Sequence, residues 1–548
     1  MNFHAKTNTM KFTIVTLLAL FVSFQFMQCH PANSNNAKVS DVELVQSKIP
    51  VFIGKKDVPL CTLNLQMGEA NEKISLKDIN LKFTWDSQLA CIANVSVTNS
   101  GTEIPLFGST DKIKLETAVS GNSPLLQGAN SISFNFTLKD DAILTESFEV
   151  QEVELTLSNK QTIKVKPESK FTFRPAKILR AAGQDNCDTY RIPGLITTNS
   201  GTLIAVYDNR YNNSKDLQED VDIGMSRSTD GGQTWEPMRV IMDMGEWGGN
   251  PESLNGIGDP CVLYDEKNST IWVAALWMSG ATVKDMLWWA SKPGMKPTET
   301  GQFMLAKSTD DGLTWSEPIN ITRQIKEPAW QLLLQGPGMG ISMKNGTLVF
   351  PAQFKSDIGE KSLDGGQYTC HSTIVYSTDG GENWQIGAGA KTNTTEAQVA
   401  ELADGTLMLN MRDDLNRKDK SETNGRAVSV TKDMGKTWQT HPTSNSALPE
   451  PNCMASLISA ETMVNGSKKH VLFFSNPNNK NERTNMTIKA SLDEGMTWPA
   501  EYQVELNEEG GYGYSCLTMV DENTVGILYE GVKDLFFQKI PVTDILGR

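Results

Sequence analysis

The chain has 548 residues, of which 39% are hydrophobic and 21% charged, and its formal net charge is −15 at pH 7. This composition excludes a disordered chain and fits two or three domains, or one large β architecture plus a module. The acidic balance argues against nucleic acid as a partner. Any anionic substrate must be captured by local positive charge, because the overall field would repel it.

The N-terminal segment 1–29 predicts an export signal. Lys6 and Lys11 precede an apolar run from Phe12 to Met27 that is too short and too interrupted for a membrane span, and no later segment could span a bilayer. Cys29 follows directly and suggests a lipid anchor of the lipoprotein type, although the residues before it are not the usual small ones. Cleavage near "PANS" is the alternative. We therefore expect an exported protein: periplasmic, associated with the outer membrane, or secreted.

Residues 30–177 predict a β-sandwich. The stretch "EVELTLSNKQTIKVK" alternates apolar and polar residues around a polar turn, as a β-hairpin does, and "SISFNFTLKD" has the same strand character. Two packed sheets are the natural architecture for such a segment. The module is either a carbohydrate-binding unit or a spacer.

A short repeat follows the sandwich. It has the pattern Ser/Thr-x-Asp-x-Gly-x-Thr/Asn-Trp and occurs five times, at Ser228–Trp235, Ser308–Trp315, Ser377–Trp384, Thr431–Trp438 and Ser491–Trp498. Asp and Gly suit a tight turn, and the Trp packs back on it as an apolar pin. The interval between successive copies fits one four-stranded blade and predicts a β-propeller.

The aspartates of this repeat, the Asp box, are candidates for catalysis or calcium binding. The same unit recurs from blade to blade, however, whereas an active site occurs once. The Asp boxes therefore indicate the fold and not the function. The cysteines and histidines are also uninformative about chemistry, since the eight cysteines are scattered without a Cys-x-x-Cys pair and only five histidines are present.

Five Asp boxes together with "YRIPGL" (Tyr190–Leu195) resemble the sialidases, or neuraminidases, of glycoside hydrolase family 33. The resemblance runs from about Lys177 to the end of the chain. It implies an all-β fold with a six-bladed β-propeller catalytic domain at 178–548, preceded by the β-sandwich module. It also implies that the partners are sialylated glycans: glycoproteins, glycolipids and oligosaccharides.

Sialic acid carries a carboxylate on its anomeric carbon, so its site needs fixed positive charge, and the planar fork of arginine matches a carboxylate. The resemblance assigns this task to Arg191, Arg412 and, with a looser local motif, Arg483. An internal ion pair is the alternative for Arg191 and Arg483. Arg210 matches a fourth arginine near the 4-hydroxyl of the sugar. Asp259, fixed before a proline, matches an aspartate that holds the N-acetyl N–H and the 4-hydroxyl.

A carboxylate nucleophile would meet a repulsion of about 4 kcal/mol from the substrate's own carboxylate at about 4 Å in an effective dielectric of about 20. Sialidases use a neutral tyrosine instead. Tyr514 in "GGYGYSCLTM" matches it, with Tyr512 as the alternative. Because tyrosine is a weak nucleophile at neutral pH, a base must accept its proton. Glu396 matches this base, since its interval to Arg412 resembles the family's Glu-to-Arg interval across one hairpin, and Glu401 is the weaker candidate.

Two further acidic residues complete the predicted site. Asp216 matches the acid/base aspartate that protonates the departing oxygen, although a solvated acidic loop with Glu219, Asp220 and Asp222 is the alternative. Glu530 in "GILYEG", downstream of Tyr514, matches the glutamate that orients Arg191.

These residues predict a retaining exo-α-sialidase that hydrolyses terminal sialic acids through a tyrosine nucleophile and needs no metal or organic cofactor. A trans-sialidase would share every residue named. A non-catalytic sialic-acid-binding propeller would need only the arginines, and the additional Tyr, Glu and Asp argue against it. An Asp-box propeller of another specificity would have no reason for the arginines.

Overall fold

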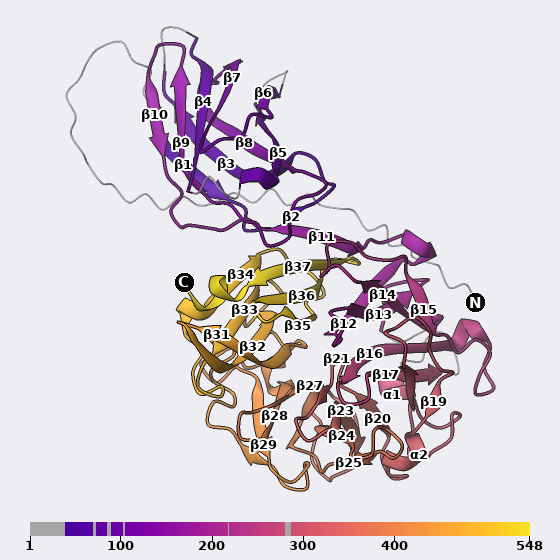
Figure 1. Ribbon diagram of the computed structural model, residues 1–548. Helices are drawn as coiled ribbons and strands as arrows, with labels where there is room; N and C mark the ends of the chain where they lie inside the picture. The colour runs from indigo at the N-terminus through magenta and orange to yellow at the C-terminus, as the bar shows by residue number, and fades with distance from the viewer. Residues whose placement is uncertain are drawn as a thin grey trace, which may run out of the picture.

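A computed structural model describes residues 39–69, 73–84, 89–101, 105–216, 219–279 and 287–547. The predicted export signal, with Cys29, lies outside the described residues. Strands dominate the described chain, and they form a smaller β module joined to a ring of sheets (Figure 1). Within the described ranges, no helix is long and apolar enough to cross a membrane.

The N-terminal module is a sandwich of two antiparallel sheets, and the predicted hairpin is present as the antiparallel pair β9–β10. Phenyl rings fill the space between the sheets. Phe136 stacks on Phe148, and Phe148 stacks on Phe173, with centroid separations of 5.3 and 5.4 Å. One sheet has the order β1 (Val39–Gln46), β3 (Val58–Met67), β8 (Gly128–Leu138), β5 (Ile92–Asn99), β6 (Leu106–Thr110), and the other β10 (Thr162–Val165), β9 (Val150–Leu157), β4 (Ser75–Phe83), β7 (Glu116–Pro124).

The remaining strands form six blades around a common axis, as predicted. Blade 1 consists of β12 (Thr189–Thr197), β13 (Leu203–Arg210), β14 (Val221–Ser228) and β15 (Arg239–Met242). Blade 2 consists of β16 (Asn255–Asp265), β17 (Thr270–Ser279), β18 (Gln302–Ser308) and β19 (Ile319–Asn320). In blade 3, β20 (Leu332–Gln335) and β22 (Ile341–Ser342) pair with β23 (Leu348–Ser356), which continues to β24 (Thr369–Ser377) and β25 (Gln385–Ile386). The short β21 (Gly338–Met339) pairs with β16, and β26 (Lys391–Thr392) with β24.

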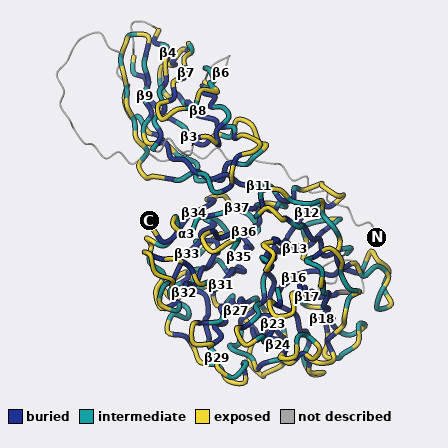
Figure 2. The backbone as a smooth tube through the Cα atoms, viewed as in Figure 1, coloured by how far each residue is buried: buried dark blue, intermediate teal, exposed yellow. Residues whose placement is uncertain are grey.

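Blades 4 and 5 follow the same four-stranded plan. Blade 4 consists of β27 (Thr394–Glu401), β28 (Leu407–Asp413), β29 (Ala427–Thr431) and β30 (Gln439–Thr440). Blade 5 consists of β31 (Ser456–Val464), β32 (Ser467–Pro477), β33 (Met486–Ser491) and β34 (Gln503–Asn507). Among the described residues, three single-turn α-helices lie between or after strands: α1 (Leu287–Ala290), α2 (Thr322–Ile325) and α3 (Val542–Leu546). Residues of the blades are mostly buried, and exposed residues gather in the turns (Figure 2).

Blade 6 closes the ring with a strand from before the propeller. Its order is β35 (Ser515–Asp521), β36 (Thr524–Glu530), β37 (Leu535–Pro541) and then β11 (Pro175–Arg180), which is antiparallel to β37. Strand β2 (Val51–Phe52), at the edge of the module, adds to β11 in parallel. The predicted boundary between 177 and 178 therefore falls inside a strand of the closing blade.

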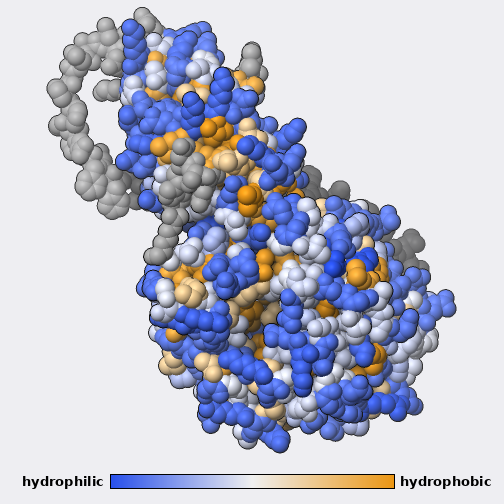
Figure 3. All heavy atoms as spheres, in the orientation of Figure 1, coloured by the Kyte–Doolittle hydropathy of each residue, from blue (hydrophilic) through white to orange (hydrophobic). Residues whose placement is uncertain are grey.

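The module also contacts the propeller through side chains. Arg174 forms an ion pair with Asp544 at 3.0 Å, and the ring of Phe52 lies 4.6 Å from that of Phe536. On the face shown in Figure 3, hydrophilic side chains cover most of the propeller, and apolar ones gather on the module and near the junction.

Each Asp box forms a tight turn after the third strand of its blade. In the first, Asp230 accepts hydrogen bonds from the backbone N–H and hydroxyl of Thr234 and from the hydroxyl of Ser228. Equivalent contacts recur at Asp310, Asp379, Asp433 and Asp493, except that the side-chain amide of Asn383 replaces the threonine hydroxyl at Asp379. Both oxygens of each carboxylate accept hydrogen bonds within its own turn, which supports the interpretation that the repeat is a folding device.

The first box allows a direct test of this role. Gly232 has φ +83°, and a Cβ there would overlap the Phe537 ring on β37, whereas a Cβ on neighbouring Gly231 (φ +69°) would meet nothing closer than 3.5 Å. Gly231→Ala should cost about 1–2 kcal/mol for the left-handed backbone, and Gly232→Ala about 1–3 kcal/mol more for overpacking. Thermal unfolding of both variants measures the difference, and equal melting temperatures would contradict the predicted clash.

Candidate active site

A cavity of about 310 Å³ brings most of the predicted site residues together. It takes side chains from blades 1 to 4 and from the loop that leads into blade 6. Its lining is Ile192, Asp216, Asp259, Leu276, Trp288, Trp289, Leu332, Leu334, Gln353, Asp364, Thr395, Glu396, Arg412, Arg417 and Tyr514. None of these residues belongs to an Asp box.

Glu396, Arg412 and Tyr514 form one hydrogen-bonded group. Glu396 lies on β27 and Arg412 on β28, the adjacent antiparallel strand, while Tyr514 directly precedes β35. The Tyr514 hydroxyl donates to one carboxylate oxygen of Glu396, and Arg412 donates to the other at 2.6 Å. Arg412 also donates to the Tyr514 oxygen at 3.1 Å. The carboxylate is therefore shared between the phenol proton and a fixed cation.

The electrostatics of this group separate an ionised carboxylate from a protonated phenol. Burial raises the pKa of Glu396, but the Arg412 charge, the hydrogen bonds from Tyr514 and Arg412 and the Arg483 charge together bring the pKa below its usual value. Burial and then the negative charge of Glu396 raise the pKa of Tyr514 well above its usual value. In the free protein Glu396 is therefore the ionised partner and Tyr514 the protonated one, which is the starting arrangement of a general base beside a nucleophile; the two shifts also widen the pKa gap that the proton must cross.

Arg191 is braced by Glu530. Its Nε donates to Glu530 Oε1 at 3.1 Å, and the same oxygen accepts the backbone N–H of Ile192 at 2.8 Å. The second oxygen of Glu530 accepts the backbone N–H of Tyr514 at 2.9 Å. Glu530 is buried, so one carboxylate fixes the arginine fork and the backbone of Tyr514 together.

Asp216 forms ion pairs with Arg191 and with Arg210. Its Oδ1 accepts from Arg191 Nη1 at 2.7 Å and from Arg210 Nη1 at 2.8 Å, while its side chain stays 59% exposed. Partial loss of water around its oxygens in the site raises the pKa of Asp216, but the charges of Arg191 and Arg210, the Arg210 hydrogen bond and the Arg412 charge together bring it below its usual value. In this arrangement Asp216 is paired with Arg191, the arginine that the sequence analysis predicts will bind the substrate carboxylate.

A buried aspartate that the sequence analysis did not single out organises this side of the cavity. Asp208 Oδ2 accepts from Arg210 at 2.8 and 3.0 Å, and its other oxygen accepts the backbone N–H of Asp259 at 2.8 Å. Asp259 has φ +56°, as a residue held in a tight turn does. Burial, and next the charge of Asp208, raise the pKa of Asp259 well above its usual value.

Arg483 lies beside Tyr514, but it does not line the cavity. It donates to the backbone carbonyls of Tyr512 at 2.8 Å and Asn452 at 3.2 Å, and its guanidinium carbon lies 5.6 Å from the centroid of the Tyr514 ring. The predicted residues are therefore connected by contacts, although Arg191, Arg210, Glu530 and Arg483 do not themselves line the cavity.

The structure places the alternative residues elsewhere. Tyr512 packs its ring on Arg191 at 4.4 Å, while the contact with Glu396 is made by Tyr514. Glu401 lies at the other end of β27 and accepts from the backbone of Lys344. Asp222 accepts from Tyr211, and it does not line the cavity.

Several other cavity residues carried no signal in the sequence. Trp288 donates to Asp364 at 2.9 Å, and the buried Lys355 forms an ion pair with the same carboxylate while lying 4.0 Å from the Trp288 ring centroid. Trp288 and Asp364 line the cavity on the side of blades 2 and 3, and Lys355 contacts both of them. In the part of the chain that the structure describes, no group of three or more His, Cys, Asp and Glu side chains could hold a metal ion.

Two family models match this chain. Residues 201–527 match the BNR repeat-like domain, and residues 39–161 match the N-terminal domain of BNR-repeat neuraminidase. A sialidase of Bacteroides fragilis (strain YCH46) is 43% identical over 534 residues, covering 91% of this chain and 94% of the relative. A sialidase of Paraclostridium sordellii is 30% identical over 362 residues, covering 63% of this chain and 82% of the relative.

Among solved structures, the Hadza microbial sialidase Hz136 matches with a TM-score of 0.80 and 41% identity, covering 92% of this chain and 100% of that one. The match spans both the module and the propeller. With the Asp-box blades and the assembled cavity, these similarities show that the chain belongs to the sialidase (neuraminidase) family of BNR-repeat glycoside hydrolases.

Proposed function

We propose that the protein is a retaining exo-α-sialidase that uses Tyr514 as nucleophile and releases terminal sialic acid from glycoconjugates. The observation that carries the proposal is the hydrogen bond from the Tyr514 hydroxyl to Glu396, in a pocket bounded by arginines. A neutral nucleophile surrounded by positive charge suits a substrate whose anomeric carbon bears a carboxylate.

In the first step, Arg191 and Arg412 bind the substrate carboxylate, and Arg483, which lies beside Tyr514 and donates to two backbone carbonyls, adds positive charge. Glu396 accepts the phenol proton as the Tyr514 oxygen bonds to the anomeric carbon, the glycosidic C–O bond breaks, and Asp216 gives its proton to the leaving oxygen. In the second step, Asp216 takes a proton from water, whose oxygen attacks the anomeric carbon. The bond to Tyr514 breaks, and Glu396 returns the proton to the phenol oxygen. Two inversions give net retention.

The test uses a pair of sialyl-lactose isomers, one linked α2-3 and one α2-6. Release of free sialic acid, with the α-anomer appearing first in the NMR spectrum, would support the proposal. First appearance of the β-anomer would contradict retention. Transfer of the sialyl group to added lactose in place of water would identify a trans-sialidase. Binding without release would identify a sialic-acid-binding propeller.

The ion pair between Asp216 and Arg191 predicts a difference between two pH profiles. In the free enzyme the two arginines lower the pKa of Asp216, so its protonated form is lost at lower pH. A bound substrate carboxylate takes over Arg191 and adds a like charge, and loss of an Asp–Arg pair raises a pKa by about 1–3 units. The basic limb of kcat, which reports the complex, should therefore lie at higher pH than that of kcat/KM, which reports the free enzyme. Coincident basic limbs would contradict this displacement.

We further propose that the protein acts outside the cytoplasm, as its predicted export signal suggests. N-terminal sequencing and mass analysis of the mature chain test this and distinguish a lipid on Cys29 from cleavage near "PANS".

A further inference from the structure

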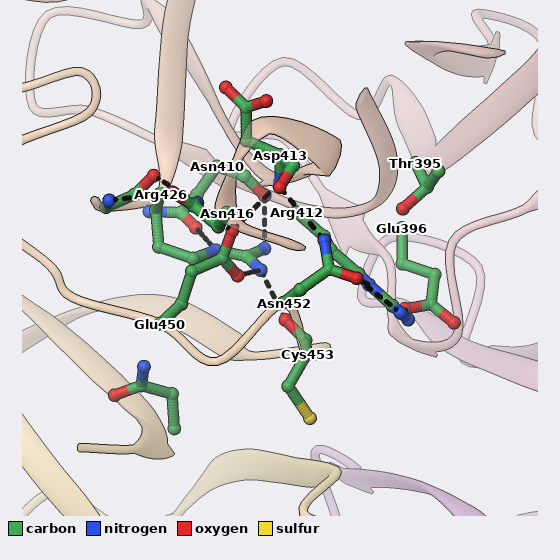
Figure 4. A network of polar contacts seen from close by, with 12 residues as sticks. Thr395, Glu396, Asn410, Arg412, Asp413, Asn416, Arg426, Glu450, Asn452 and Cys453 are labelled. Carbon is green, nitrogen blue, oxygen red and sulfur yellow. Dashed lines mark hydrogen bonds and ion pairs between the residues drawn. The ribbon is translucent and has the colours of Figure 1, made fainter. Parts of the chain in front are cut away.

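Arg412 and Arg191 are held by different kinds of partner. Arg191 donates to two carboxylates, Glu530 and Asp216. Arg412 donates its Nη1 to Glu396, but its Nε and Nη2 donate to a neutral amide oxygen, Asn452 Oδ1, at 3.3 and 3.0 Å (Figure 4). Two nitrogens of the Arg412 guanidinium group are therefore held by a neutral side chain, and Glu396 is the one carboxylate among the described residues to which Arg412 donates.

Asn452 is itself held in one orientation. Its Nδ2 donates to the backbone carbonyl of Asp413 at 2.9 Å, so Oδ1 must face the guanidinium group. Its backbone carbonyl accepts from Arg483 at 3.2 Å. Asn452 thus contacts two of the three predicted carboxylate-binding arginines. It has φ +58°, a conformation that asparagine and glycine tolerate better than other residues.

A buried ion pair anchors the segment that carries Asn452. Arg426 and Glu450, both almost fully buried, pair at 2.8 Å. Arg426 also donates to the carbonyl of Cys453 at 2.6 Å, and Glu450 accepts the backbone N–H of Asp413 at 2.9 Å (Figure 4). Residues 450–453 are in this way tied to β28 and to the residue just before β29, the segments that carry Arg412 and Arg426.

We infer that Asn452 is a positioning residue of the proposed sialidase reaction: its neutral amide fixes the plane of Arg412 so that Nη1 faces Glu396 and Tyr514, and leaves the arginine charge available to the substrate carboxylate. The inference rests on the proposed function. A carboxylate at 452 would give Arg412 two anionic partners and would repel the substrate.

Two variants separate geometry from charge. Asn452→Gly keeps the positive φ and the carbonyl that binds Arg483, but removes the amide from Arg412. Asn452→Asp keeps the shape and adds a charge. Asn465→Gly is the matched control, since Asn465 also has positive φ (+50°) and belongs to blade 5, but lies exposed in the β31–β32 turn.

With α2-3-sialyl-lactose as substrate, kcat/KM of both Asn452 variants should fall by about 10- to 100-fold, which is the size expected when hydrogen bonds to a charged group are lost. In Asn452→Asp, most of this fall should appear as a higher KM. The acidic limb of kcat/KM should move to higher pH by about one unit, since Glu396 loses part of the stabilisation of its charge. Melting temperatures should stay near that of wild type, and Asn465→Gly should have wild-type kinetics.

Unchanged kinetics in Asn452→Gly would overturn the inference while leaving the proposed function intact. A loss of activity with an unmoved pH profile and a lowered melting temperature would also overturn it, because that is the result of a merely structural role. If wild type releases no sialic acid, the proposed function fails first. A crystal structure of Asn452→Gly then decides the positioning role: Arg412 displaced from Glu396 supports it, and Arg412 in place overturns it.

Discussion

Replacing Tyr514 with phenylalanine is expected to lower kcat by about a thousandfold or more, because loss of a nucleophile removes the covalent route and general-base assistance alone contributes about 10²–10⁴-fold. The fold should survive, since the ring packs with Ile192, Cys453 and Met454 and the backbone N–H still donates to Glu530. KM should change little, because Arg191 and Arg483 are untouched. Steady-state release of sialic acid from sialyl-lactose measures the loss.

Tyr512→Phe is the matched control for this change. Tyr512 is close to Tyr514 in the chain and packs on Arg191, but the hydrogen bond to Glu396 belongs to Tyr514. We expect its turnover to stay within a few-fold of wild type. Quenching wild type during turnover and analysing its peptides by mass spectrometry should place the sialyl group on the peptide with Tyr514. Near-normal turnover of Tyr514→Phe would remove Tyr514 from the nucleophile role.

Replacing Glu450 with alanine should lower stability by about 3–5 kcal/mol, which is the usual cost of leaving one charge of a buried pair without its partner. Glu450 and Arg426 are 1% and 0% exposed, and Glu450 also accepts from Asn416 and the backbone of Asp413. Arg426 would remain in the interior of blade 4 with its charge uncompensated. Thermal and urea unfolding, followed in the full chain, measure the change.

Asp404→Ala provides the control on the same blade. Asp404 pairs with Lys432 at 2.9 Å, but the side chains are 58% and 75% exposed, so loss of the pair should leave the melting temperature nearly unchanged. A similar melting temperature for Glu450→Ala and Asp404→Ala would show that the buried pair does not stabilise blade 4.

Local chemistry explains why the propeller could be predicted from the sequence. An Asp box satisfies its turn with its own side chains, so its signature lies within one short stretch of chain and repeats with each blade that carries it. The alternation of β9 and β10 is equally local. The β11 strand of blade 6 could not be placed in this way, because its partner β37 lies at the opposite end of the propeller sequence.

The candidate site was predictable only where a motif carried it. Arg191 follows from "YRIP", and Glu396 from its interval to Arg412, since two antiparallel strands bring them together. Glu401 was excluded by geometry, because it lies at the far end of the same strand, where it accepts from the backbone of Lys344. Asn452 and Asp208 have no local pattern, because tertiary contacts bring Asn452 to Arg412 and tie Asp208 to the turn at Asp259.

The way the ring closes has a consequence during biosynthesis. Tyr514 and Glu530 belong to a segment made after blades 1 to 5, and the edge of their sheet is completed by β11, which is made before those blades. Until β37 is available, one edge of β11 has unsatisfied backbone hydrogen-bonding groups, and only β2 pairs with its other edge. A chain that lacks β35 to β37 therefore has neither a closed ring nor a complete candidate site, so the site cannot assemble before blade 6 pairs with β11.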